Sequence, residues 1–101
     1  LLDRAYLAAP PGDDLPYLRT FLAQIHTDLA FDATSVKYLP TYHEGRIQVK
    51  NGPELWVDFL KSEPQTLKEL TVFWRSPQLK GVKYRYIDLR LPNGKVVYRE
   101  G

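Results

Sequence analysis

The chain has 101 residues, 44% of them apolar and 26% charged, which is the profile of one ordinary globular domain. It contains no cysteine, and this excludes disulfide frameworks, zinc knuckles and cysteine nucleophiles. Its 14 basic and 12 acidic residues leave a net charge of +2, too small for a field that would dominate binding to DNA or anionic lipid. The charges are unevenly spread, because six basic residues and a single acidic one lie between Lys80 and Arg99.

The start of the sequence indicates a piece of a longer protein. Its first four residues, Leu-Leu-Asp-Arg, have neither an initiating methionine nor the basic-then-apolar order of a signal peptide. No apolar run approaches the ~20 residues of a membrane span. We therefore expect residues 1–101 to be a single domain excised from a longer chain.

The N-terminal half is expected to begin with a helix and a strand. Apolar residues recur at three- and four-residue steps from about Leu15 to Leu29, which predicts an amphipathic helix. A β-prone stretch from Thr34 to Leu39, stopped by Pro40, predicts the first strand. The apolar side of the helix carries Leu18, Phe21, Leu22, Ile25 and Leu29.

A β-hairpin is predicted from Gly45 to Leu60, because an Asn-Gly pair separates two runs in which apolar and polar residues alternate. We expect a three-residue loop over residues 51–53, since a two-residue loop would set Val49 against Glu54 and mix the two faces. The expected cross-strand pairs are Lys50 with Glu54, Val49 with Leu55, Gln48 with Trp56, Ile47 with Val57 and Arg46 with Asp58. The core-facing residues are then Ile47, Val49, Leu55, Val57 and Phe59.

A second helix is predicted from about Glu63 to Arg75. Ser62 and Gln65 form a capping-box pattern at its start, and Pro77 follows its end. Its apolar stripe consists of Leu67, Leu70, Phe73 and Trp74.

The C-terminal residues predict a second hairpin, with strands at Val82–Leu91 and Lys95–Arg99 on either side of an Asn-Gly turn. Pro92 removes one ladder hydrogen bond and leaves room for a slightly wider loop. A two-residue turn opposes Leu91 to Val96, Leu89 to Tyr98 and Asp88 to Arg99. One face of the first strand then carries Ile87, Leu89 and Leu91, and the other carries Tyr84, Tyr86, Asp88 and Arg90.

The order helix, strand, hairpin, helix, hairpin predicts an α+β domain with a largely antiparallel sheet of hairpins and two helices on one face. The last strand, Lys95–Arg99, has no successor in the sequence. We therefore expect it at an edge of the sheet, where its unpaired backbone groups can template a partner strand.

The sequence gives little sign of catalysis. His26 and His43 lie apart and lack the further ligands that a metal site needs. The serines occur without a Gly-x-Ser-x-Gly turn, and the glycines are too isolated to form a phosphate-binding loop. We expect no catalytic residues, no metal, no cofactor and no small-molecule substrate.

An alternative function is that of a small nucleic-acid-binding α+β domain. Tyr84, Tyr86 and Arg90 would form its binding face, with rings for base stacking and a cation for phosphate. The same face also fits a solvated sheet surface in which Asp88 pairs with Arg90 or Arg99, and the near-neutral charge favours that interpretation. If the chain is a nucleic-acid-binding domain, its binding of RNA or DNA should depend steeply on salt concentration.

The tetrad at residues 87–90, Ile-Asp-Leu-Arg, is followed by a short turn and an apolar strand. Before it come a strand with an Asn-Gly turn, a second strand, and a helix that contains Thr66–Leu70 and ends before Pro77. This arrangement resembles the end of the extracytoplasmic β domain of the FtsQ/DivIB family of bacterial cell-division proteins. The resemblance covers the chain from about Gly45 onward by sequence, and the part before it by layout.

The resemblance implies a non-enzymatic scaffold of the divisome, with no nucleic-acid partner. Members of the family are single-pass proteins of the bacterial cell membrane, with a POTRA domain and this β domain on the extracytoplasmic side. The span and the POTRA domain are absent from this piece. The family joins FtsB (DivIC) and FtsL and connects them to peptidoglycan synthesis at the division septum.

The resemblance also implies a partner-binding site. In the family, FtsB adds a strand to the last strand of the domain by β-augmentation. We expect Arg90 to help anchor an acidic residue of that partner unless it is committed to Asp88, and Val97→Pro to abolish binding if the Val97 N–H points outward. The chain departs from the family in two places: Leu91 stands directly after the tetrad arginine, where some members have an aromatic residue, and the turn contains Pro92. The implied partner-binding residues are Tyr86, Arg90, Leu91, Asn93, Gly94, Lys95, Val96, Val97, Tyr98 and Arg99.

Overall fold

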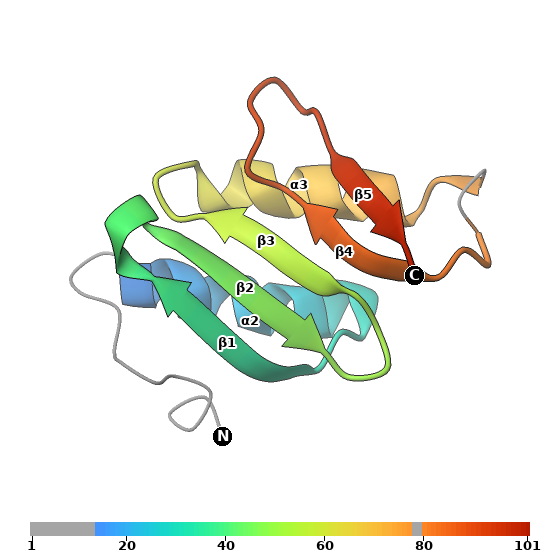
Figure 1. Ribbon diagram of the computed structural model, residues 1–101, viewed down its shortest axis with the longest axis horizontal. Helices are drawn as coiled ribbons and strands as arrows, with labels where there is room; N and C mark the ends of the chain where they lie inside the picture. The colour runs from blue at the N-terminus through green and yellow to red at the C-terminus, as the bar shows by residue number, and fades with distance from the viewer. Residues whose placement is uncertain (1–13, 78–79) are drawn as a thin grey trace.

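The computed structural model of the protein describes residues 14–77 and 80–101. Within these ranges the chain forms helices and strands in the predicted order (Figure 1). The elements are α2 (Asp14–Leu29), β1 (Ala33–Leu39), the 3-10 turn η1 (Pro40–Tyr42), β2 (Glu44–Val49), β3 (Glu54–Asp58), α3 (Glu63–Trp74), β4 (Tyr84–Asp88) and β5 (Val97–Glu100). None of the described helices is long and apolar enough to cross a membrane.

The five described strands form one sheet in the order β1-β2-β3-β4-β5. Neighbouring strands are antiparallel except β3 and β4, which are parallel and are connected by α3. Both described helices lie against the same face of the sheet, and no other described element covers the opposite face, the open face (Figure 1). The predicted α+β fold with a largely antiparallel sheet is confirmed.

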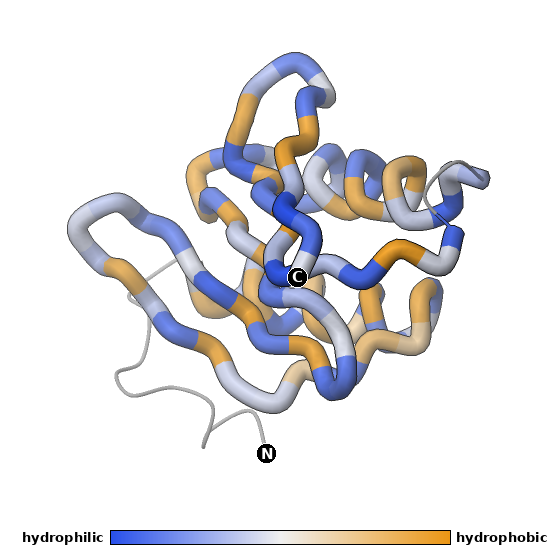
Figure 2. Tube along the Cα trace, turned by 45° about the vertical axis from the view of Figure 1, so that its right-hand side comes forward, coloured by the Kyte–Doolittle hydropathy of each residue, from blue (hydrophilic) through white to orange (hydrophobic). Residues whose placement is uncertain are grey.

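The core lies between the helices and the sheet. Hydrophobic and hydrophilic residues alternate along the hairpin strands (Figure 2), so each strand presents one apolar side to the helices. On the predicted apolar side of α2, Leu18, Phe21, Leu22 and Ile25 are buried and Leu29 is partly buried. The core-facing residues predicted for the first hairpin are all buried: Ile47, Val49, Leu55, Val57 and Phe59.

The first hairpin has the predicted faces, but the predicted register is wrong by two residues. Ile47 lies opposite Leu55, and Arg46 lies opposite Trp56 rather than Asp58. The loop is residues 50–52 and is closed by the Val49 N–H, which donates to the Pro53 carbonyl at 3.1 Å. A slip of two residues keeps every side chain on its own face, so the alternation of the sequence cannot distinguish the two registers.

The second hairpin is also shifted by two residues, and its loop is much wider than predicted. Ile87 lies opposite Tyr98, where the sequence predicted Leu89. β4 ends earlier than predicted and β5 begins later, which leaves residues 89–96 as the connection between them. The Leu89 N–H donates to the Trp56 carbonyl at 2.9 Å, so the chain beyond β4 continues along β3 instead of turning back at once.

A β-bulge in β4 places Tyr84 on the side opposite to the predicted one. The register of β4 against β5 shifts between Tyr84 and Tyr86, so Arg85 is the extra residue. Tyr84 is only 9% exposed, and its ring packs near those of Phe73 and Trp74 at 5.5 and 5.9 Å between centroids. The prediction that Tyr84 shares a face with Tyr86 is therefore wrong.

Polar contacts join the two helices beneath the sheet. The Tyr17 hydroxyl donates to Thr66 Oγ1 at 3.0 Å, and that oxygen donates in turn to the Ser62 carbonyl. Burial raises the pKa of Tyr17 to about 12, so its hydroxyl remains a donor at neutral pH. Ser62 caps α3 as predicted, because its side chain accepts from the Gln65 N–H.

Gly45 leaves space for the ring of Phe59. A Cβ atom at this position would lie 2.7 Å from Phe59 Cζ. The ring cannot move away easily, because it packs against Tyr17 and Tyr38 with centroid separations of 5.1 and 5.8 Å. The glycine is therefore required by packing and not by its backbone dihedrals.

We expect Gly45→Ala to lower the free energy of unfolding by about 1–3 kcal/mol, because the added methyl overpacks a buried ring. Urea denaturation measures the change. Combining it with Phe59→Leu should cost less than the two single changes added together, since the smaller side chain makes room for the methyl. Additive losses in the double variant would contradict this packing account.

Candidate functional site at the β5 edge

β5 is an edge strand of the described sheet, as predicted, although it covers residues 97–100 instead of 95–99. It pairs with β4 on one side only. All four of its residues are exposed, and Val97 and Tyr98 keep 39% and 40% of their surface accessible. Within the described chain, the outer side of β5 therefore offers a row of backbone groups for another strand.

The direction of these backbone groups follows from the residue after the strand. The Gly101 N–H donates to the Lys83 carbonyl at 3.2 Å, so Gly101 faces inward. Backbone groups alternate along a strand, which directs those of Val97 and Arg99 to β4 and those of Tyr98 and Glu100 outward. Val97→Pro was expected to abolish partner binding only if the Val97 N–H pointed outward. That condition is not met, because this N–H faces β4.

The side chains of β5 divide between the two faces of the sheet. Tyr98 lies on the helix side, where its ring is 5.3 Å from that of Phe73 and the same distance from that of Tyr84. Arg99 lies opposite Tyr86 and Val97 opposite Asp88, which places both on the open face. An added strand would therefore meet an aromatic surface on one side and a basic one on the other.

Arg90 is engaged inside the domain. Its Nε and Nη2 donate to Asp88 at 2.9 and 2.8 Å, and its Nη1 donates to Glu44 at 2.9 Å. Its side chain is 31% exposed. The Asp88–Arg90 ion pair that the sequence analysis allowed is confirmed. Arg90 also pairs with Glu44 of β2, so the ion pairs reach across the sheet.

The polar face of β3 carries a stack of side chains around Trp56. The rings of Trp56 and Tyr86 are parallel, with centroids 4.0 Å apart and an interplanar angle of 7°. The guanidinium groups of Arg46 and Arg90 lie 4.5 and 5.1 Å from the Trp56 ring centroid. The indole N–H donates to Glu54 at 2.7 Å. These contacts explain why a tryptophan occupies a strand position outside the core.

The predicted nucleic-acid face is not assembled by this fold. Tyr84 is buried on the helix side, Tyr86 is stacked on Trp56, and Arg90 is bound to two carboxylates. A base would have to displace an existing ring contact in order to stack there.

A largely buried lysine side chain joins the connection between β4 and β5 to α3. Lys61 Nζ donates to Glu69 Oε1, to the Leu89 carbonyl at 3.0 Å and to the Leu91 carbonyl at 2.7 Å. The side chains of Lys61 and Glu69 are only 14% and 5% exposed. Gln65 Nε2 donates to the other carboxylate oxygen of Glu69 at 2.9 Å. The chain leading to β5 is thereby fixed to the helix.

Sequence reasoning missed Lys61 and Glu69. Eight residues separate them, and a helix start lies between them, so no helical or strand periodicity relates the two. Their apolar neighbours carried other signals, because Leu60 was assigned to the end of the first hairpin and Leu70 to the apolar stripe of the second helix.

The remaining predicted site residues lie in or beside the turn before β5. Asn93 and Gly94 are exposed and have positive φ angles of 61° and 72°, which suits their residue types. Val96 is partly buried against the core. Four exposed cations surround the edge and pair with no carboxylate among the described residues: Lys83, Arg85, Lys95 and Arg99.

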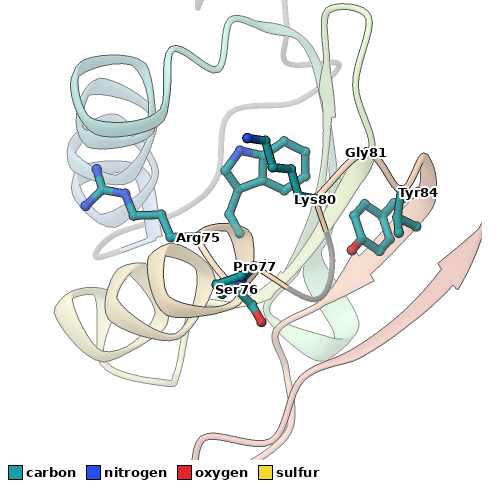
Figure 3. A pocket seen from close by; sticks show the side chains of 8 residues that line it. Arg75, Ser76, Pro77, Lys80, Gly81 and Tyr84 are labelled. Atoms are coloured by element: carbon teal, nitrogen blue, oxygen red, sulfur yellow. The ribbon is translucent and has the colours of Figure 1, made fainter.

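A further pocket lies away from the β5 edge. A pocket of about 350 Å³ lies at the end of α3, with Lys80 and Tyr84 among its lining residues (Figure 3). Arg75 also lines it, and its guanidinium reaches α2, where it donates to the Asp28 carbonyl at 3.1 Å. No three His, Asp or Glu side chains among the described residues are grouped so as to hold a metal.

The sequence matches no protein-family model, and no curated protein matches it.

We expect Lys61→Met to loosen β5 more than the rest of the sheet, because two carbonyls of the preceding connection lose their donor. Hydrogen exchange should quicken at residues 97–101 well before it does in β1 and β2. Lys61→Met with Glu69→Gln should recover part of the global stability, since no unpaired carboxylate is then buried, but should not restore β5 protection. Lys37→Met, at an exposed position in β1, serves as the control. A uniform rise in exchange would contradict this local role.

The Asp88–Arg90 pair predicts a specific response to acid. Burial acts to raise the pKa of Asp88, but hydrogen bonds from Arg90 outweigh it and hold that pKa below its ordinary value. The pair thus stabilises the fold fully above the unfolded-state pKa of about 3.9, and this contribution is lost as the pH falls through the folded value. Asp88→Asn should be less stable by about 1–3 kcal/mol at pH 7 and should lose less on acidification below pH ~4. Parallel urea titrations of the two proteins from pH 2 to 7 measure this, and equal losses would refute it.

Proposed function

We propose that this chain is a non-enzymatic scaffold domain of the FtsQ/DivIB type, which binds an FtsB/DivIC-type partner by strand addition at β5. In this proposal the full-length protein is anchored in the bacterial cell membrane by a single span. The domain lies on the extracytoplasmic side at the division septum, where it holds FtsB- and FtsL-type proteins together during cell division.

The free outer edge of β5 is the observation that carries the proposal. A short strand with two outward-facing residues, Tyr98 and Glu100, offers backbone donors and acceptors that only an extended segment can satisfy together. Support also comes from the fold, because its helices and strands follow the order found in the family that the C-terminal sequence resembles.

The charges around the edge favour an acidic partner. Lys95 and Arg99 are exposed and have no carboxylate partner among the described residues, so they are available to a carboxylate of another chain. Arg90 was expected to make this contact, but each of its three guanidinium nitrogens already donates to Asp88 or Glu44 within the domain. In the present proposal the tetrad arginine stabilises the end of β4, and Arg99 takes the contact with the partner.

The test removes one outward backbone donor at a time. Glu100→Pro deletes an N–H that faces the partner, and the exposed side chain contributes little to the fold. We expect the affinity for the extracytoplasmic segment of the FtsB/DivIC-type protein to fall about tenfold, the value of one lost hydrogen bond together with poorer strand fit, while the melting temperature changes little.

Glu100→Ala is the matched control, because it removes the same side chain and keeps the N–H. It should bind nearly as well as the parent, whereas Arg99→Glu should weaken binding by charge reversal. A folded Glu100→Pro variant that binds like the parent in calorimetric titrations would overturn strand addition at β5.

A further inference from the structure

A groove of about 480 Å³ lies beside β5 on the helix side of the sheet. Val72, Phe73 and Lys68 line it from α3, and Gly94 and Val96 line it from the approach to β5. Val72 is 66% exposed, although it lies in the last turn of a helix whose other large apolar residues belong to the core or pack against it. The groove thus combines an uncovered apolar side chain with the free edge of a sheet.

The neighbouring edge determines what can fill this groove. A strand that pairs with β5 would lie about 4.8 Å beyond it and would direct alternate side chains to the helix side. Tyr98 already follows this direction from β5, since its ring contacts that of Phe73. The next strand would therefore place its helix-side residues over Val72 and Val96.

The other side chains of such a strand would lie on the open face. Arg99 is exposed there, and Lys95 is exposed just before β5. Neither pairs with a carboxylate among the described residues. Acidic residues are the complementary choice at these positions.

We infer that the β5 edge selects an extended segment in which apolar and acidic residues alternate. The apolar residues enter the groove against Val72 and Val96, and the acidic residues lie beside Arg99. This inference rests on the proposed function, because it assigns a sequence chemistry to the partner of the same edge.

The test uses three synthetic heptapeptides. The first is Glu-Val-Glu-Leu-Glu-Val-Glu, the second has the same composition in the order Glu-Glu-Val-Leu-Val-Glu-Glu, and the third has serine in place of each apolar residue. Binding is followed by NMR titration and by the exchange rates of the Tyr98 and Glu100 amides. The alternating peptide should slow exchange at both amides and bind at least about tenfold more tightly than either of the others, because it alone places all three apolar side chains on one face of the strand and all four acidic side chains on the other.

Val72→Lys tests the groove itself. The position is exposed, so the variant should fold, and its affinity for the alternating peptide should fall about tenfold, to that of the serine peptide. Tyr42→Lys is the control, since Tyr42 is 67% exposed and lies in η1 at the opposite edge of the sheet. It should bind the alternating peptide like the parent.

The outcomes separate this inference from the proposed function. If the serine peptide protects the same amides with equal affinity, or if Val72→Lys has no effect, the groove has no role and the edge mechanism stands. If no heptapeptide protects β5 but the FtsB/DivIC-type segment does, the alternating pattern is wrong. If neither protects β5, strand addition fails and this inference fails with it.

Discussion

The ammonium group of Lys61 joins the parts of the C-terminal half. It comes from the turn between β3 and α3, and its hydrogen bonds reach a helix carboxylate and two carbonyls of the chain that leaves β4. A buried charge is costly unless it is paired and its donors are satisfied, and here all three donors are used. Because β5 follows directly on that chain and pairs only with β4, the position of the proposed binding edge depends on this one side chain.

The fold could be predicted from the sequence because its signals are local. Helical spacing fixed both helices to within one residue, and alternation fixed which residues of the first hairpin are buried. The registers could not be predicted, since a slip of two residues leaves the alternation unchanged. They depend on contacts between distant segments, such as the Leu89 N–H on the Trp56 carbonyl, which no local pattern encodes.

The candidate site divides in the same way. The sequence predicted that the last strand would lie at an edge, as β5 does in the described sheet, and the basic character of this end was visible in the sequence. The roles of individual side chains could not be predicted. Arg90 is held by Asp88 and by Glu44, and the Glu44 contact spans 46 residues. Tyr84 lies on the helix side, opposite to the prediction, because a single extra residue in β4 inverts the alternation of side chains.

An open edge normally exposes a protein to pairing with copies of itself, and the features of β5 bear on this risk. The strand has only four residues, and exposed cations lie beside it on both strands of its hairpin. A second copy of β5 would bring its own Arg99 and Lys95 close to these cations. The repulsion between like charges would then oppose the pairing of the two strands. An acidic segment gains attraction from the same charges. Like-charge repulsion and acidic complementarity are thus two effects of one set of side chains, and together they favour a foreign strand over a second copy.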